Sequence, residues 1–153
     1  MRGYFGIGIY RPKTEMNIGT LWRSAFLFGA SFIFVIGKRY RKQPNDTPNT
    51  ELHVPLFEYK DWEDFLEHVP HKCEVVCIEM AESSTNLIEA SHHERAIYVL
   101  GAEDKGIPEE YLEGHQVLTI PTIKPFSLNV ATAGSIVMYD RISKQKLTLK
   151  EGE

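Results

Sequence analysis

The chain has 153 residues, of which 42% are hydrophobic and 25% are charged, and its formal net charge is -4. This composition is typical of a globular protein and excludes a disordered or fibrous one, and the length suits a single domain over residues 1–153. The negative net charge argues against a protein that coats nucleic acid over its whole surface, but it leaves room for a local basic patch.

Neither the apolar segments nor the cysteines indicate an extracellular or membrane protein. The longest apolar run, Ala25 to Gly37, is too short to span a bilayer, and no signal-peptide pattern begins the chain. Cys73 and Cys77 would lie on the same face of a strand, too far apart for an ordinary disulfide. We therefore expect a cytoplasmic protein that does not contact membranes and has buried free thiols.

The first forty residues predict a strand, a helix and a second strand. Residues 3–10, G-Y-F-G-I-G-I-Y, have the β-branched and aromatic content of a buried strand, with glycines where another backbone approaches closely. These glycines are not spaced as in a dinucleotide-binding fingerprint. A helix is expected from Asn17 to Phe28, ended by Gly29, and a buried strand from Ser31 to Ile36. This order builds parallel sheets.

A basic loop follows the second strand. It contains four cations around Tyr40, namely Lys38, Arg39, Arg41 and Lys42. Such a cluster is either a solvated surface turn or a contact for phosphate groups, and the residues alone allow both.

The middle of the chain alternates apolar and polar segments. We expect, in order, a short strand at 52–57, a helix at 61–68 with Trp62, Phe65 and Leu66 inside, a strand at 73–78, a partly helical segment at 83–94 and a strand at 96–100. The loop 101–108, G-A-E-D-K-G-I-P, then lies at the carboxyl end of a strand, where open α/β sheets bind ligands.

The C-terminal part predicts a short helix at 108–112, a strand at 116–120, a proline-punctuated loop and a long helix. Ser127 is the expected N-cap of that helix. Its inner face would carry the residues at three- and four-residue spacing, which are Leu128, Ala131, Thr132, Ser135, Ile136, Tyr139 and Ile142. The small residues from Ala131 to Ser135 suit close contact with a ligand or another backbone, or the helix only packs on the core.

Three short motifs occur in order along the chain. They are N-x-G-x-x-x-R at Asn17, Gly19 and Arg23, L-G-A-E-D-K-G at residues 100–106, and S-L-N-V-A-T-A at residues 127–133. Together, and placed at element boundaries, they resemble the three motifs of the SpoU branch of the SPOUT methyltransferases. The resemblance covers about residues 7–139 and is strongest to the short members that methylate the ribose at the tRNA wobble position.

This resemblance implies an α/β fold, a mostly parallel sheet flanked by helices, with a C-terminal deep trefoil knot, which is rare among proteins. It implies a homodimer with the C-terminal helix in the interface. It also implies S-adenosylmethionine as the cofactor, held in the knot largely by backbone groups. The residues that match these loops are Ile78, Glu79, Leu100, Gly101, Ile120, Ser127 and Leu128.

The resemblance also assigns catalytic roles. Arg23 would bind the substrate phosphate and assist deprotonation of the ribose hydroxyl, although arginine alone is a poor base. Asn17 and Asn129 would orient Arg23 and the ribose, and Glu103 would be the acidic group near the site. Each residue also has an interpretation that needs no active site. Arg23 would be a surface arginine on a helix and Asn17 a helix cap. Asn129 would be a polar residue of a first turn and Glu103 an acidic residue of a loop.

The expected function is therefore transfer of a methyl group to a ribose 2'-hydroxyl of RNA, tRNA in particular. The expected RNA contacts are Arg11, Lys13, Lys38, Arg39, Arg41 and Lys42. A non-catalytic knotted RNA-binding relative and a flavodoxin-like nucleotide-binding module are the alternatives. No metal is expected, because the paired histidines lack a third ligand at a recognisable spacing.

Overall fold

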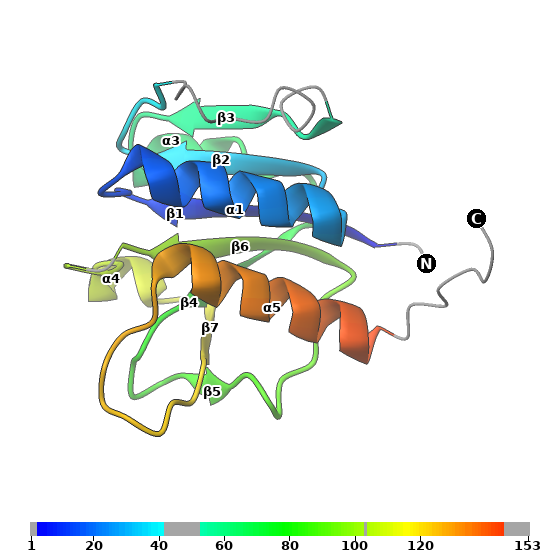
Figure 1. Ribbon diagram of the computed structural model, residues 1–153, viewed down its shortest axis with the longest axis vertical. Coiled ribbons are helices and arrows are strands. Elements are labelled where there is room, and N and C mark those ends of the chain that lie inside the picture. The colour runs from blue at the N-terminus through cyan, green and yellow to red at the C-terminus, as the bar shows by residue number, and fades with distance from the viewer. Residues whose placement is uncertain (1–2, 42–52, 103, 146–153) are drawn as a thin grey trace.

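The computed structural model describes residues 3–41, 53–102 and 104–145, and they form one parallel sheet with helices on both faces (Figure 1). Its seven strands lie in the order β3-β2-β1-β6-β4-β7-β5, and every pairing between neighbours is parallel. The strands are β1 Tyr4–Tyr10, β2 Phe32–Ile36, β3 Leu56–Tyr59, β4 Glu74–Ile78, β5 Thr85–Asn86, β6 Arg95–Gly101 and β7 Gln116–Thr119. The helices are α1 Glu15–Phe28, α3 Trp62–Glu67, α4 Glu109–Leu112 and α5 Val130–Lys144.

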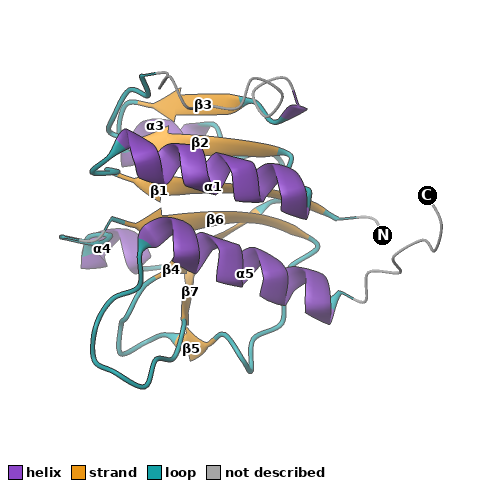
Figure 2. Ribbon diagram, viewed as in Figure 1, coloured by secondary structure: helices purple, strands orange, loops and turns teal. Residues whose placement is uncertain are grey.

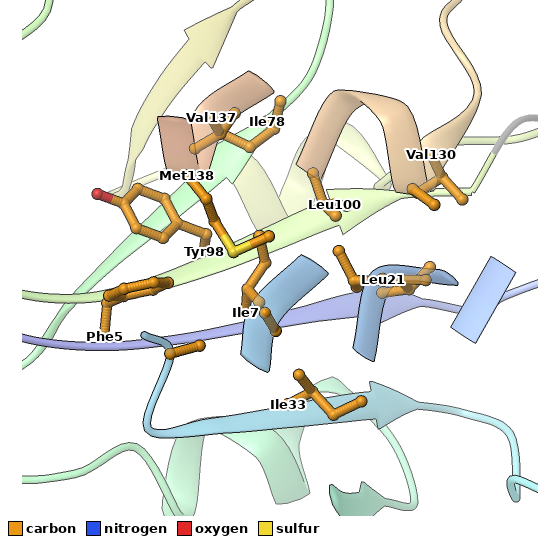
Figure 3. Close-up of a cluster of buried hydrophobic side chains, with 14 of the residues drawn as sticks. Phe5, Ile7, Leu21, Ile33, Ile78, Tyr98, Leu100, Val130, Val137 and Met138 are labelled. Carbon is orange, nitrogen blue, oxygen red and sulfur yellow. The ribbon is translucent and has the colours of Figure 1, made fainter. Parts of the chain in front are cut away.

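The helices form a layer on each face of the sheet (Figure 2). Helices α1 and α5 lie side by side over one face, where the buried cluster joins residues such as Ile7, Leu21 and Met138 (Figure 3). Helices α3 and α4 pack on the other face, in a second cluster with Phe34 and Trp62. Because successive residues of a strand point to opposite faces, the central strands are apolar along their whole length.

The glycines of β1 make room for aromatic rings. The register pairs Gly6 with Phe32 and Gly8 with Phe34. A methyl group added at either glycine would overlap the ring of its partner. The close neighbour of Gly6 is therefore an aromatic ring, whereas Gly8 is approached both by the ring and by the backbone carbonyl of Phe34, the latter as expected.

Helix α1 starts two residues before the predicted position. The side chain of Thr14 accepts a hydrogen bond from the backbone N of Asn17 at 3.3 Å, so Thr14 is the N-cap and Asn17 lies in the first turn. The predicted end is confirmed, because Gly29 adopts the left-handed conformation, with φ 82°, that closes many helices.

Helix α5 differs from the prediction in both its cap and its buried face. Asn129, not Ser127, is the N-cap. The buried positions are Val130, Ala131, Gly134, Val137, Met138 and Arg141, whereas the predicted inner face leaves Tyr139 63% exposed. The reason is close packing at Gly134, where a methyl group would lie 2.5 Å from Cδ1 of Leu21. Glycine is not counted as apolar when the spacing of apolar residues is analysed, so the pattern predicted the wrong face of the helix to be buried.

Three other predictions need correction. The segment 83–94 is not helical: it contains the short strand β5, which pairs with β7, followed by a turn in which Asn86 Oδ1 accepts from Ile88 N at 2.9 Å. The predicted strand at 52–57 is β3, shifted to 56–59. Leu66 of α3 is 40% exposed, although Trp62 and Phe65 are buried as expected.

Both cysteines have free thiols, as expected, with Cys77 buried and Cys73 half-buried. Within the described residues, no helix has the length and apolar content that a bilayer crossing requires.

A buried polar network anchors the C-terminal half of α5 to the sheet. Arg141, which is 1% exposed, donates from Nη1 to the hydroxyl of Tyr98 at 3.0 Å. That hydroxyl lies 2.7 Å from Nδ1 of His92, and Nε2 of His92 lies 2.6 Å from Oδ2 of Asp140. Because the Asp140 carboxylate can only accept, neutral His92 donates from Nε2 to it, and Nδ1 then accepts the proton of the Tyr98 hydroxyl. Lys144 also contacts Asp140, at 2.9 Å.

The pKa of His92 is lowered from its ordinary value of 6.5, chiefly because burial disfavours the charged ring. Asp140 opposes this effect, while Arg141 and Lys144 reinforce it. The lowering prevails because burial is the largest of these effects.

This network predicts that the protein loses stability when the pH falls below about 6.5, because the unfolded chain then takes up a proton that folded His92 resists. The measurement is the free energy of unfolding in urea at about pH 7.5 and about pH 5.5, a window above the titration of ordinary carboxylates. We expect a smaller loss in His92→Gln than in the wild type. Equal losses in the two proteins would contradict the assignment.

Candidate functional site

A pocket of about 260 Å³ lies at the carboxyl ends of β4, β6 and β7. It contains all seven residues that the sequence placed at a cofactor site: Ile78, Glu79, Leu100, Gly101, Ile120, Ser127 and Leu128. It also contains residues that were not predicted, which are Met80, Ala102, Asp104, Lys105, Gly106, Thr119, Thr122, Phe126, Val130 and Ala133. Nearly all of these lie within a few residues of a predicted one, on the same loops.

The register of the strands brings the ends of β4, β6 and β7 side by side, so the loops that follow them start close together. Strand β4 lies between β6 and β7, and Ile78 is paired with Leu100 on one side and with Leu118 on the other. The backbone N of Glu79 continues the ladder by donating to the carbonyl of Leu118 at 3.0 Å. Because all three strands are parallel, the segments that follow them leave the sheet at the same edge.

The Glu79 side chain holds two of the pocket loops together. Its Oε1 accepts a hydrogen bond from the backbone N of Ile107 at 2.8 Å, and its Oε2 accepts one from Met80 N at 3.2 Å. The carboxylate lies so close to Gly101 and Gly106 that a methyl group at either position would overlap it. Gly106 also has φ 60°, which favours glycine. The resemblance predicted Glu79 as a residue of a cofactor-binding loop after a strand, and the sequence gave no sign of this contact.

Two asparagines join the first and third motifs. Asn129 Nδ2 donates to Asn17 Oδ1 at 3.0 Å, across 112 positions of sequence. Asn129 Oδ1 accepts from the backbone N of Ala131 and Thr132 at 3.0 and 3.1 Å, which fixes the orientation of the amide. Asn129 is thus the cap of α5 and a link to α1 at once, directly between two pocket residues, Leu128 and Val130.

Of the other two predicted catalytic residues, the structure describes only Arg23. Arg23 is exposed on α1, and within the described part of the chain no hydrogen bond or ion pair joins it to the pocket. Leu27, one turn further along the same face of α1, is 68% exposed. Glu103 lies outside the described residues.

The predicted basic RNA contacts that the structure describes lie on the loops after β1 and β2, and Lys13 contacts the pocket. Lys13 Nζ forms an ion pair with Asp104 of the pocket, with an N–O distance of 2.6 Å. Lys38 Nζ donates to the carbonyl of Lys13 at 3.2 Å and lies 3.9 Å from Glu15. Acidic neighbours therefore balance part of this charge.

Of the remaining predicted RNA contacts, the structure describes three and leaves out one. The guanidinium of Arg11 lies 5.7 Å from the centre of the Tyr10 ring, and Arg39 and Arg41 are exposed. Lys42 lies outside the described residues.

The pocket combines apolar walls with a few polar groups. Ile78, Leu100 and Ile120 supply the apolar surface, and the Glu79 carboxylate and loop backbone supply the polar groups. Such a site suits a ligand with a flat apolar part and a charged or hydrogen-bonding part. In residues 3–41, 53–102 and 104–145, no three His, Cys, Asp or Glu side chains gather in a way that could hold a metal ion.

Comparisons with known proteins give one consistent result. The model of the SpoU rRNA Methylase family matches residues 5–139. A Mycoplasma pneumoniae protein named "Putative tRNA (cytidine(34)-2'-O)-methyltransferase" is 26% identical in an alignment 146 positions long, which covers 88% of this chain and 87% of that protein.

Two solved structures share the fold. One, described as giving insights into 2'-OH methylation of C/U34 on tRNA, has a TM-score of 0.78 and 26% identity, covering 95% of this chain and 98% of its own. The other is the SpoU methyltransferase AviRb from Streptomyces viridochromogenes with AdoMet, with a TM-score of 0.82 and 18% identity, covering 95% of this chain and 59% of its own. At that identity the second likeness concerns the fold alone.

The family model extends from β1 into α5 and includes the three motifs, the pocket loops and the asparagine pair. The chain therefore belongs to the SpoU rRNA Methylase family.

Proposed function

We propose that this protein is an S-adenosylmethionine-dependent methyltransferase that methylates a ribose 2'-hydroxyl of RNA, with tRNA as its substrate. The observation that carries the proposal is the convergence of three distant loops on one pocket, with the Asn17–Asn129 hydrogen bond beside it. Membership of the SpoU family supports the reaction. The names of the relatives that match nearly the whole chain support tRNA as the substrate.

The pocket residues fit this cofactor. Apolar side chains of Ile78, Leu100 and Ile120 suit the adenine ring, and the lack of a side chain at Gly101 lets backbone groups come close to a ligand. The Glu79 carboxylate suits a cationic or hydroxyl-bearing part of the molecule. When bound, S-adenosylmethionine supplies an electrophilic methyl group on a positively charged sulfur.

The residues of the chain would then act mainly by positioning. Displacement at a methyl carbon needs the attacking oxygen in line with the leaving sulfur, so holding the ribose still lowers the barrier. We assign this task to Asn17 and Asn129, whose mutual hydrogen bond fixes both amides. Arg23, always protonated at neutral pH, would bind an RNA phosphate, and an oxygen of that phosphate would take the hydroxyl proton. We retain Glu103 in this proposal as an acidic group near the site.

We propose a homodimer formed by the outer face of the α1 and α5 layer. Large apolar side chains are exposed there, with Leu27 at 68%, Tyr139 at 63% and Ile136 at 37%. The rings of Phe28 and Tyr139 lie 6.4 Å apart, so this surface is continuous between the two helices. Exposed apolar patches of this kind mark protein interfaces. Arg23 lies one turn from Leu27, so a dimer would place it next to the partner.

We further propose that the chain forms a single domain whose C-terminal segment is threaded as a trefoil knot. After β7, near one edge of the sheet, the chain returns through the long loop 120–129 to α5, which lies beside α1 over the middle of the sheet (Figure 1). The family supports the threading of this return path.

Of the two alternative functions, one is wrong and the other is decided by experiment. A flavodoxin-like module has the strand order 2-1-3-4-5, whereas here β6 lies between β1 and β4. The strand order and the family match therefore make that alternative wrong. A non-catalytic RNA-binding relative differs from an enzyme only in turnover, which methyl incorporation into tRNA measures.

Substituting Arg23 should separate catalysis from cofactor binding. We expect Arg23→Ala to lower methyl incorporation into tRNA by at least about 100-fold, because the substrate phosphate loses its cation. Its calorimetric affinity for S-adenosylmethionine should be unchanged, and its stability should stay within about 0.5 kcal/mol of the wild type, since Arg23 is exposed. Lys60→Ala, which removes an exposed cation outside the pocket, is the matched control. A wild-type protein that binds the cofactor but transfers no methyl would be the non-catalytic relative.

Reversing charge in the basic loop should weaken RNA binding through lost phosphate contacts. In Arg39→Glu/Arg41→Glu, we expect the plot of log Kd against log salt concentration to become shallower by about two units, one for each contact. Cofactor affinity should not change. Lys60→Glu/Lys72→Glu reverses the same number of exposed charges elsewhere. A salt dependence equal to the wild type would place the RNA on another surface.

The proposed dimer can be tested by sedimentation velocity. Tyr139→Glu would bury a charge in the interface, so we expect the variant to sediment as a monomer where the wild type is a dimer. Ile88→Glu changes a residue that is 70% exposed in the turn after β5 and should leave the dimer intact. A monomeric wild type, or a dimeric Tyr139→Glu, would overturn the assignment.

A further inference from the structure

The Glu79 carboxylate is a charged group in the pocket without a cationic partner in the described part of the chain. Its hydrogen bonds come from two backbone amides, those of Met80 and Ile107. None of the ion pairs formed by the described residues involves it. Backbone dipoles stabilise a carboxylate but do not cancel its charge, so the pocket carries a negative potential.

The other charged side chains that line the pocket are placed differently. Asp104 is 59% exposed at its side chain and is paired with Lys13, and Lys105 is exposed. Solvent and the salt bridge screen their charges. Glu79 is half-buried between Gly101 and Gly106, so solvent screens its charge less than the charges of Asp104 and Lys105.

The charge of Glu79 also affects the pKa of the neighbouring Cys77 thiol. Burial is the main cause that raises the pKa of Cys77 to about 12, and the negative charge of Glu79 adds to it. The charge therefore acts beyond the two hydrogen bonds that the carboxylate accepts.

Loop shape alone does not require a charge at position 79. A glutamine of the same length offers one oxygen that can accept the hydrogen bond from Ile107 N. Glutamine lacks the negative charge, and it also lacks the second acceptor oxygen, so the 3.2 Å hydrogen bond from Met80 N would be lost. The charge therefore calls for a role of its own.

We propose that Glu79 makes the pocket selective for the charged methyl donor over its spent, uncharged product. Transfer breaks the bond between methyl carbon and sulfur and forms one between that carbon and the ribose oxygen. The electron pair of the broken bond stays on sulfur, which loses its positive charge, and the hydroxyl proton goes to a phosphate oxygen. The attraction to Glu79 exists before transfer and is absent after it, so the carboxylate favours product release. This inference rests on the proposed function.

The test is isothermal titration of the purified full chain with S-adenosylmethionine and with S-adenosylhomocysteine. In Glu79→Gln, we expect Kd for S-adenosylmethionine to rise about tenfold and Kd for S-adenosylhomocysteine to stay within about twofold. Glu82→Gln makes the same chemical change at an exposed position after β4, outside the pocket, and should change neither value.

Each other outcome is decisive. If Glu79→Gln weakens both ligands equally, or neither, the carboxylate only shapes the loop and the inference is overturned. If that variant does not fold, the wild type decides, because it should bind S-adenosylmethionine about tenfold more tightly than S-adenosylhomocysteine and equal affinities overturn the inference. If the wild type binds neither ligand, the proposed function itself fails.

Discussion

The packing of α5 against α1 and β6 is the constraint on which the rest of the site depends. It places Gly134 against Leu21 of α1 and Leu100 of β6, whose methyl groups fill the space that a side chain at this position would occupy. Close packing here sets which face of α5 is buried, and it aligns the start of α5 with the start of α1. Asn129 and Asn17 can then share a hydrogen bond across most of the chain. At the other end, Arg141 and the His92 network prevent α5 from sliding along the sheet.

The second requirement is the arrangement of charge. The protein is acidic overall, which is unusual for a partner of RNA, but several of its basic residues lie together on the loops after β1 and β2. Glu79 is held inside the pocket by backbone amides, while the cations of the β1 and β2 loops lie at its edge, linked to it through Lys13 and Asp104. A cationic small molecule and an anionic polymer could therefore approach neighbouring surfaces without competing for the same charges.

The errors in the sequence-based predictions share a cause. Strands and helices whose signal is local were predicted within a few residues, as β1, β2, β4, β6 and α1 demonstrate. The buried face of α5 was not, since it depends on a glycine that fits against Leu21. The segment 83–94 was predicted as partly helical because it is polar, whereas its conformation depends on pairing with β7 and on Lys144 donating to the carbonyls of Leu87 and Ala90. Both contacts join residues far apart in sequence.

The sequence by itself determined the fold class, the family and the seven residues that meet in the pocket, because motifs at the ends of parallel strands converge on one edge of the sheet. Tertiary structure alone decided how these residues are held. It made Asn129 a helix cap as well as a partner of Asn17, placed Arg23 on an outer face and put the Glu79 carboxylate between two glycines. Side-chain contacts of this kind depend on register and packing between distant segments, and no local pattern encodes them.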